Sequence, residues 1–131
     1  MNENDAIGII VTHGNLAREL LNTVETIVGK VDFCYAISNA DLSDDAMIAR
    51  IRKIIDEHAE SYAILFVDYF GGSCSMSCSR AVKGYEKAVV ISGINLPILL
   101  DFVTKRGTMK PEEIVRNLIR RGQESVRVMT R

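Results

Sequence analysis

Two side chains that could do chemistry together, His13 and Asp68, each come directly after a predicted strand. The strands cover residues 6–12 and 62–67, and their mostly apolar composition is typical of strands buried in a parallel sheet. In open α/β sheets, ligands bind beyond the carboxyl ends of the strands. If these two strands are neighbours, His13 and Asp68 face each other across a crevice at that edge.

An imidazole beside a carboxylate is suited to nucleophilic chemistry. A carboxylate that accepts the proton of one ring nitrogen leaves the other nitrogen with a free lone pair. It also stabilises the positive charge that develops when the ring attacks an electrophile. The sequence has no Gly-Xaa-Ser-Xaa-Gly motif that would supply a serine nucleophile. His13 is therefore the candidate nucleophile, and Asp68 is the candidate orienting group.

The segment Gly71-Gly72-Ser73 follows Asp68 closely and precedes a predicted helix. Glycines at this place let backbone N–H groups approach an anion, and the helix N-terminus adds partial positive charge. The serine hydroxyl is a further donor. We therefore expect a phosphoryl group to be held next to His13. The candidate phosphate-binding residues are Gly71, Gly72, Ser73, Cys74, Thr12 and Gly14.

Strands and helices alternate along the chain. The apolar pattern predicts strands over residues 6–12, 31–37, 62–67 and 88–92, and helices over 16–28, 44–60, 74–83, 98–105 and 111–121. Asn15, Ser43 and Ser73 are candidate N-caps. We predict one α/β domain over residues 1–131, with an open, doubly wound, mostly parallel sheet of order 2-1-3-4 and helices on both faces. Residues 126–128 alternate like a short antiparallel edge strand.

The composition excludes some classes of protein. The chain is 47% hydrophobic and 25% charged, as is usual for a globular domain, and its net charge of −1 argues against nucleic-acid binding. Its three cysteines form no paired framework, and residues 1–5 are too polar for a secretion signal. No apolar run approaches the roughly 20 residues of a membrane helix. We therefore expect a cytoplasmic protein.

Three motifs connect this chain with a known family. They are Thr12-His13-Gly14, the segment Val67-Asp68-Tyr69-Phe70-Gly71-Gly72-Ser73, and Gly93-Ile94-Asn95-Leu96-Pro97. In this order and spacing they resemble the mannose-type enzyme IIA domain of the bacterial phosphoenolpyruvate-dependent sugar phosphotransferase system. The resemblance covers nearly the whole chain. One position departs from the family, which commonly has proline where this chain has Cys74.

The resemblance implies a phosphoryl relay without a cofactor. His13 would take a phosphoryl group on Nε2 from the phosphocarrier protein HPr and pass it to a IIB component, with Asp68 orienting the ring. Contact with the membrane would be indirect, through IIC and IID components. The resemblance also implies a homodimer in which a C-terminal strand, residues 126–129 here, crosses to the other subunit.

Two alternatives to this function stay open from the sequence. One is a regulatory module, in which phosphorylation of His13 changes binding to another protein and no sugar is moved. The other is the phosphotransfer subunit of dihydroxyacetone kinase, which has the same fold. The basic residues between 105 and 131 form either a solvated helix face or a docking patch.

Some side chains near the candidate site have two interpretations each. Cys74 is either a reactive thiol at a helix N-terminus or a small core residue. Tyr69 and Phe70 either line the rim of the crevice or pack under the loop. Cys74 and Cys78 are four residues apart, but zinc would need two further ligands and His13 is the only nearby candidate, so we expect no metal site.

Overall fold

The computed structural model describes residues 5–40 and 42–131, and its centre is a four-stranded parallel sheet. The strands are β1 (Ile7–Thr12), β2 (Cys34–Ser38), β3 (Ala63–Val67) and β4 (Ala88–Ile91). They lie in the order β2-β1-β3-β4, which confirms the predicted order. Residues 1–4, which entered the prediction of a cytoplasmic protein, lie outside the described part of the chain.

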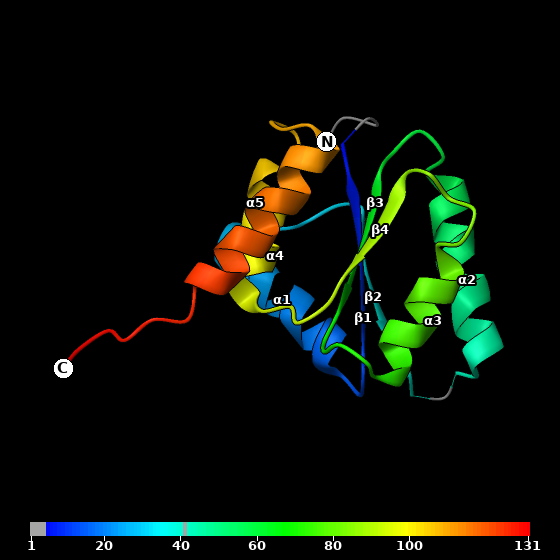
Figure 1. Cartoon of the computed structure of the whole chain (residues 1–131), viewed down its shortest axis with the longest axis horizontal. Helices are drawn as coiled ribbons and strands as arrows, with labels where there is room; N and C mark the ends of the chain where they lie inside the picture. The colour runs from blue at the N-terminus through cyan, green and yellow to red at the C-terminus, as the bar shows by residue number, and fades with distance from the viewer. Residues whose placement is uncertain (1–4, 41) are drawn as a thin grey trace.

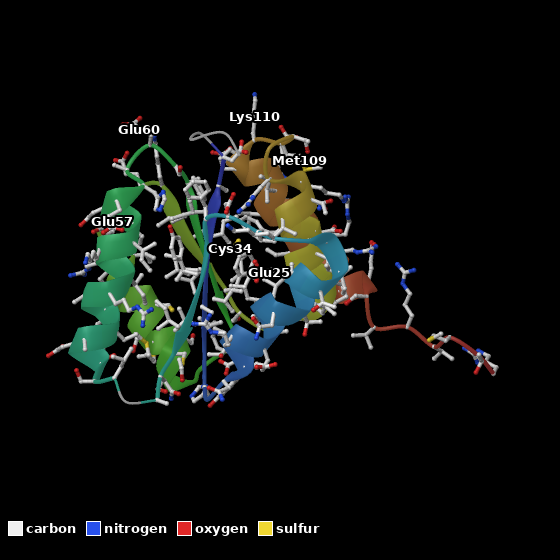
Figure 2. All side chains as sticks on the ribbon, turned by 180° about the vertical axis from the view of Figure 1, so that it is seen from behind. Glu25, Cys34, Glu57, Glu60, Met109 and Lys110 are labelled. Atoms are coloured by element: carbon white, nitrogen blue, oxygen red, sulfur yellow. The ribbon has the colours of Figure 1, made fainter. Side chains whose placement is uncertain are left out.

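Five helices cover the two faces of the sheet (Figure 1). They are α1 (Leu16–Val28), α2 (Asp44–Glu57), α3 (Ser73–Ala81), α4 (Leu96–Lys105) and α5 (Pro111–Glu124). Helices α2 and α3 pack on one face, and α1, α4 and α5 pack on the other. Figure 2 shows the same layers from behind, with Glu57 at the end of α2 on one side and Glu25 of α1 on the other.

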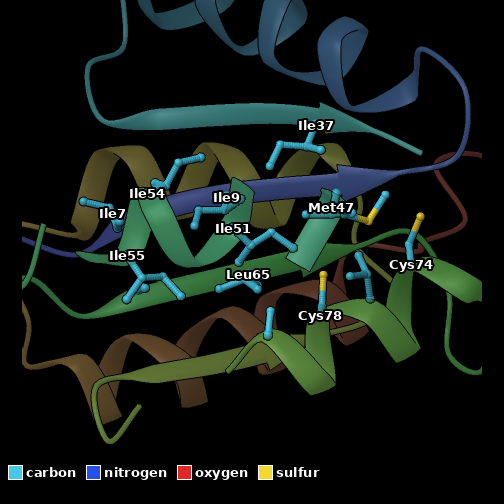
Figure 3. Packing of buried hydrophobic residues seen from close by; sticks show 14 residues of the cluster. Ile7, Ile9, Ile37, Met47, Ile51, Ile54, Ile55, Leu65, Cys74 and Cys78 are labelled. Atoms are coloured by element: carbon cyan, nitrogen blue, oxygen red, sulfur yellow. The ribbon is translucent and has the colours of Figure 1, made fainter. Parts of the chain in front are cut away.

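The strands are hydrophobic on both sides because both faces are covered. Every residue of β1 and of β3 is buried. Side chains alternate along a strand, so Ile7 and Ile9 face α2 and α3, whereas Ile10 faces α1 and α4. Figure 3 shows the hydrophobic cluster on the face covered by α2 and α3. Helix α2 contributes Met47, Ile51, Ile54 and Ile55 to it, and α3 contributes Cys74 and Cys78. The packing on both faces fixes the register of the two central strands.

The start of β2 differs from the prediction. The strand begins at Cys34, three residues later than expected, because Phe33 has a positive φ of 59° that extended pairing does not allow. The Arg106 guanidinium donates to the Asp32 carbonyl at 2.7 Å and to the Cys34 Sγ at 3.3 Å. A contact from the end of α4 therefore holds this segment as a loop, which local sequence could not indicate.

The C-terminal segment forms no strand within the single chain, and its predicted exchange with a second subunit stays a prediction. Helix α5 runs three residues further than expected, to Glu124, and residues 126–131 then leave the body of the protein as an extended tail (Figure 1). The side chains of Val126, Val128 and Met129 are 85%, 71% and 94% exposed. Among the described residues, no helix is long and apolar enough to cross a membrane.

Candidate functional site

The sheet brings His13 and Asp68 together because β1 and β3 are direct neighbours. Val11 lies opposite Val67 in the parallel ladder, so the residues just beyond the two strands meet at one edge. Strand β2 lies on the other side of β1, so the chain order reverses between β1 and β3. The reversal is the topological switch point at which open α/β sheets form their ligand crevices.

One oxygen of Asp68 contacts His13 at two places. Its Oδ2 accepts a hydrogen bond from the His13 backbone N–H at 3.0 Å and lies 2.8 Å from Nδ1 of the ring. Its Oδ1 accepts from the Tyr69 backbone N–H at 3.1 Å. A carboxylate on Nδ1 selects the tautomer that keeps the Nε2 lone pair free for attack.

The electrostatics of Asp68 suit this role. Partial burial of the side chain by itself would raise its pKa, but the hydrogen bonds from the His13 backbone and ring and from Tyr69 outweigh it. The pKa of Asp68 is therefore held below its ordinary value. The side chain is 12% exposed and that of His13 is 36% exposed, so a charged carboxylate lies behind a ring that solvent and partners can reach.

The other ring nitrogen faces the start of α3. Nε2 of His13 lies 3.1 Å from the Ser73 Oγ. We expected Ser73 to cap α3, but Gly72 occupies the N-cap position and Ser73 is the first helical residue, so its hydroxyl is directed to the histidine instead. The first N–H groups of a helix have no partner within the helix.

The two glycines before Ser73 have different reasons to be glycine. Gly71 has a φ of 87°, which other residues rarely adopt. A Cβ on Gly72 would lie 2.6 Å from the Cζ atom of Tyr69. The Tyr69 ring fills that space and stacks on His13, with centroids 5.3 Å apart and an interplanar angle of 27°. The sequence left the place of Tyr69 open; the structure gives it a contact with the imidazole, and leaves Phe70 85% exposed beside it.

Thr12 and Gly14 support the turn that carries His13. The buried Thr12 Oγ1 accepts from the Ala17 backbone N–H at 2.7 Å, whereas Asn15, the predicted cap of α1, makes no side-chain cap. The Gly14 N–H donates to Asn39 Oδ1 at 3.1 Å. Both predicted phosphate ligands thus already have partners within the fold. Sequence analysis missed Asn39, although its position just after β2 was the available signal.

Comparisons with known proteins show which family the chain belongs to. The family model described as the fructose IIA component of the phosphotransferase system (PTS) matches residues 8–119. The chain belongs to this family. The mannose-specific EIIAB component of Escherichia coli K12 is 29% identical over 92% of this chain, and the sorbose-specific EIIA component of Klebsiella pneumoniae is 26% identical over 84% of it. This chain spans 38% of the Escherichia coli protein and 82% of the Klebsiella one.

Solved structures show that the IIA fold is shared along the whole chain. The EIIA component from Streptococcus agalactiae superposes with a TM-score of 0.85 at 23% identity, covering 94% of this chain and 96% of that one. The mannose/sorbose IIA subunit from Enterococcus faecalis gives 0.78 at 21% identity, covering 97% and 96%. The fold of this chain is thus the fold of PTS IIA components.

Cys74, the position at which the resemblance would imply a proline, is a buried core residue. Its side chain is 1% exposed, and Figure 3 shows it in the cluster between α3 and the sheet. Burial, with the charge of Asp68 nearby, raises the pKa of the thiol to about 11. The structure therefore contradicts the interpretation of Cys74 as an accessible, readily ionised thiol. Its backbone N–H belongs to the first turn of α3, where N–H groups have no partner within the helix.

Proposed function

We propose that this protein accepts a phosphoryl group on Nε2 of His13 from phospho-HPr and passes it to a IIB component. The observation that carries the proposal is the arrangement of the two ring nitrogens. Nδ1 lies 2.8 Å from a carboxylate whose pKa is low, and Nε2 is directed toward the N-terminus of α3. The ring therefore has an orienting base on one side and a donor-lined space on the other.

The transfer step follows from these contacts. The Nε2 lone pair attacks the phosphorus, and the new N–P bond forms as the bond to the donor's nitrogen breaks and its electron pair returns to the donor. The imidazole gains positive charge during attack, which Asp68 stabilises through Nδ1–H. The Ser73 hydroxyl and the first N–H groups of α3, including that of Cys74, balance charge on the phosphoryl oxygens.

The return step uses the same groups in the opposite direction. A IIB acceptor that approaches the exposed side of His13 takes the phosphoryl group, and the electron pair of the N–P bond returns to Nε2. Contact with the membrane would then be indirect, through the IIC and IID components with which a IIB protein works. Neither a purely regulatory role nor a dihydroxyacetone kinase role is favoured by the curated relatives named above, which carry sugar phosphotransferase names.

The experiment uses radiolabelled phospho-HPr and the full chain. We expect the wild type to take up an acid-labile, base-stable label and His13→Ala to take up none. His58→Gln is the matched control, because His58 is the second histidine of the chain and lies at the end of α2, where its Nε2 is 2.6 Å from the Tyr35 hydroxyl. Labelling of His13→Ala at the wild-type rate would remove His13 from the mechanism.

A further inference from the structure

Three different metal-binding groups meet at the site. The side chains of His13, Asp68 and Cys74 each offer one ligand atom, and these atoms all lie within 4.8 Å of one another. From the sequence, a zinc site built on the two cysteines of α3 had too few further ligands, so no metal site was expected. The structure gives a different set of ligands. Asp68, just after the end of β3, belongs to this set, and Cys78 does not.

We propose that His13, Asp68 and Cys74 bind a thiophilic divalent cation of the zinc type, and that the bound ion and a phosphoryl group on His13 exclude each other. Zinc takes sulfur, imidazole nitrogen and carboxylate oxygen at about 2.0–2.3 Å. Tetrahedral coordination at those lengths separates neighbouring ligand atoms by about 3.3–3.8 Å. The three ligand atoms, all within 4.8 Å of one another, are close enough that small side-chain rotations would bring them to three of the four tetrahedral positions around one ion.

The chemistry of the donors selects the class of ion. A thiolate beside an imidazole favours zinc and related soft ions over magnesium and calcium, which prefer oxygen ligands alone. The ion would reach the site from the exposed side of His13, because the His13 side chain is 36% exposed while the thiol of Cys74 is buried. A solvent water is available at that side for the fourth position. The thiol gives up its proton to solvent as the sulfur–metal bond forms.

Metal and phosphoryl group compete because both need the ring of His13. An ion on Nδ1 breaks the 2.8 Å contact with Asp68, and an ion on Nε2 occupies the atom that attacks phosphorus. In either case a bound ion lowers the equilibrium constant for phosphorylation of His13 by the same factor by which phosphorylation lowers the affinity for the ion. This competition rests on the proposed function, whereas binding of the ion does not.

The binding test uses the purified full chain without phosphoryl donor. Titration with Co²⁺ should produce a thiolate-to-cobalt charge-transfer band, and Zn²⁺ should abolish it by displacement. Cys74→Ala should lose the band and weaken Zn²⁺ binding at least about 100-fold, since loss even of outer-shell partners costs about 10- to 100-fold. Cys78→Ala is the matched control: it removes an equally buried thiol of the same helix and should keep the band.

Further variants and the phosphorylated protein complete the test. His13→Gln and Asp68→Asn should each weaken Zn²⁺ binding, and circular dichroism shows whether each variant is folded. Phosphorylated protein should bind Zn²⁺ at least about tenfold more weakly than the free protein. Absence of the cobalt band in the wild type, or its persistence in Cys74→Ala, overturns the metal site. Failure of phosphoryl transfer with an intact cobalt band overturns the proposed function and leaves the metal site standing.

Discussion

At the scale of single residues, Asp68 differs from an ordinary ion-pair partner because one of its oxygens serves both the backbone and the ring of His13. The Asp68 carboxylate thereby links the imidazole of His13 to the backbone N–H of the same residue. Rotation of the ring out of position would break the contact with Nδ1 while the backbone bond keeps the carboxylate in place. The carboxylate is therefore both an electrostatic group and a positioning group.

Asp68→Asn tests these two contributions at once. The amide keeps the shape of the side chain, but it has no negative charge to stabilise an imidazolium, and its NH₂ group can favour the wrong ring tautomer. We expect transfer from phospho-HPr to slow by about 100-fold or more, equivalent to about 2.7 kcal/mol of transition-state stabilisation. Rapid-quench measurement of a single turnover gives the rate. A folded variant that reacts as fast as the wild type would contradict the role assigned to Asp68.

The contact between His13 and Asp68 could be predicted from sequence because each residue follows a strand whose apolar pattern is unambiguous. The same rule points to Asn39 only when the second strand is taken to Ser38, one residue beyond its predicted end at residue 37. The side chain that caps α1 was harder to predict from sequence. Thr12 and Asn15 are both suitable cap residues by type. Only the geometry of the turn determines that the Ala17 N–H donates to the Thr12 hydroxyl.

At the scale of elements, the close approach of α4 to β1 is what holds the histidine strand on that face. A Cβ on Gly8 would lie 2.8 Å from Cε2 of Phe102 and 3.3 Å from the Sγ of Cys34. The Phe102 ring also packs edge-on against Phe66, at 5.1 Å between centroids. The ring thus has contacts on both central strands and little room to move.

We therefore expect Gly8→Ala to destabilise the fold by about 1–3 kcal/mol, the usual cost of overpacking a filled core. The free energy of unfolding in urea measures the loss. Phe102→Leu removes the ring that the new methyl group meets, so the double variant should be more stable than the sum of the two single effects predicts. Strictly additive losses would show that the Phe102 ring is not the obstacle.

The element boundaries show where sequence patterns lose information. Ser43 caps α2 as predicted, because its hydroxyl needs only the Ala46 N–H three residues later. The start of β2 was misplaced because Arg106, more than seventy positions away, holds Asp32 and Cys34. Short-range sequence patterns predict hydrogen bonds between residues close in sequence. They cannot predict a loop that is held by a side chain far away in the sequence.

At the scale of the whole molecule, the tail after α5 is apolar, alternating and exposed. The sheet ends at β2 and β4, and strand edges of this kind accept an added strand. The sequence predicted a strand here, and the single chain has none because a strand needs a partner. We propose that this partner is the sheet of a second copy, as the family resemblance implies.

Deletion of residues 126–131 should therefore weaken a homodimer. The expected result is a dimer for the full chain and a shift toward monomer for the truncated one, measured by light scattering over a range of concentrations. Deletion of residues 130–131 alone is the matched control, since it keeps Val126, Val128 and Met129. A full chain that is monomeric at high micromolar concentration would contradict the exchange.

The pairing of β1 with β3 has a consequence for how the protein becomes active. His13 and Asp68 are 55 positions apart in the chain, and they meet only after β3 has docked on β1. A nascent chain that has formed β1, α1 and β2 already carries the nucleophile but lacks both its carboxylate and its anion-binding helix. Under the proposed function, phosphoryl acceptance therefore requires that β1, β3 and the start of α3 have already packed together.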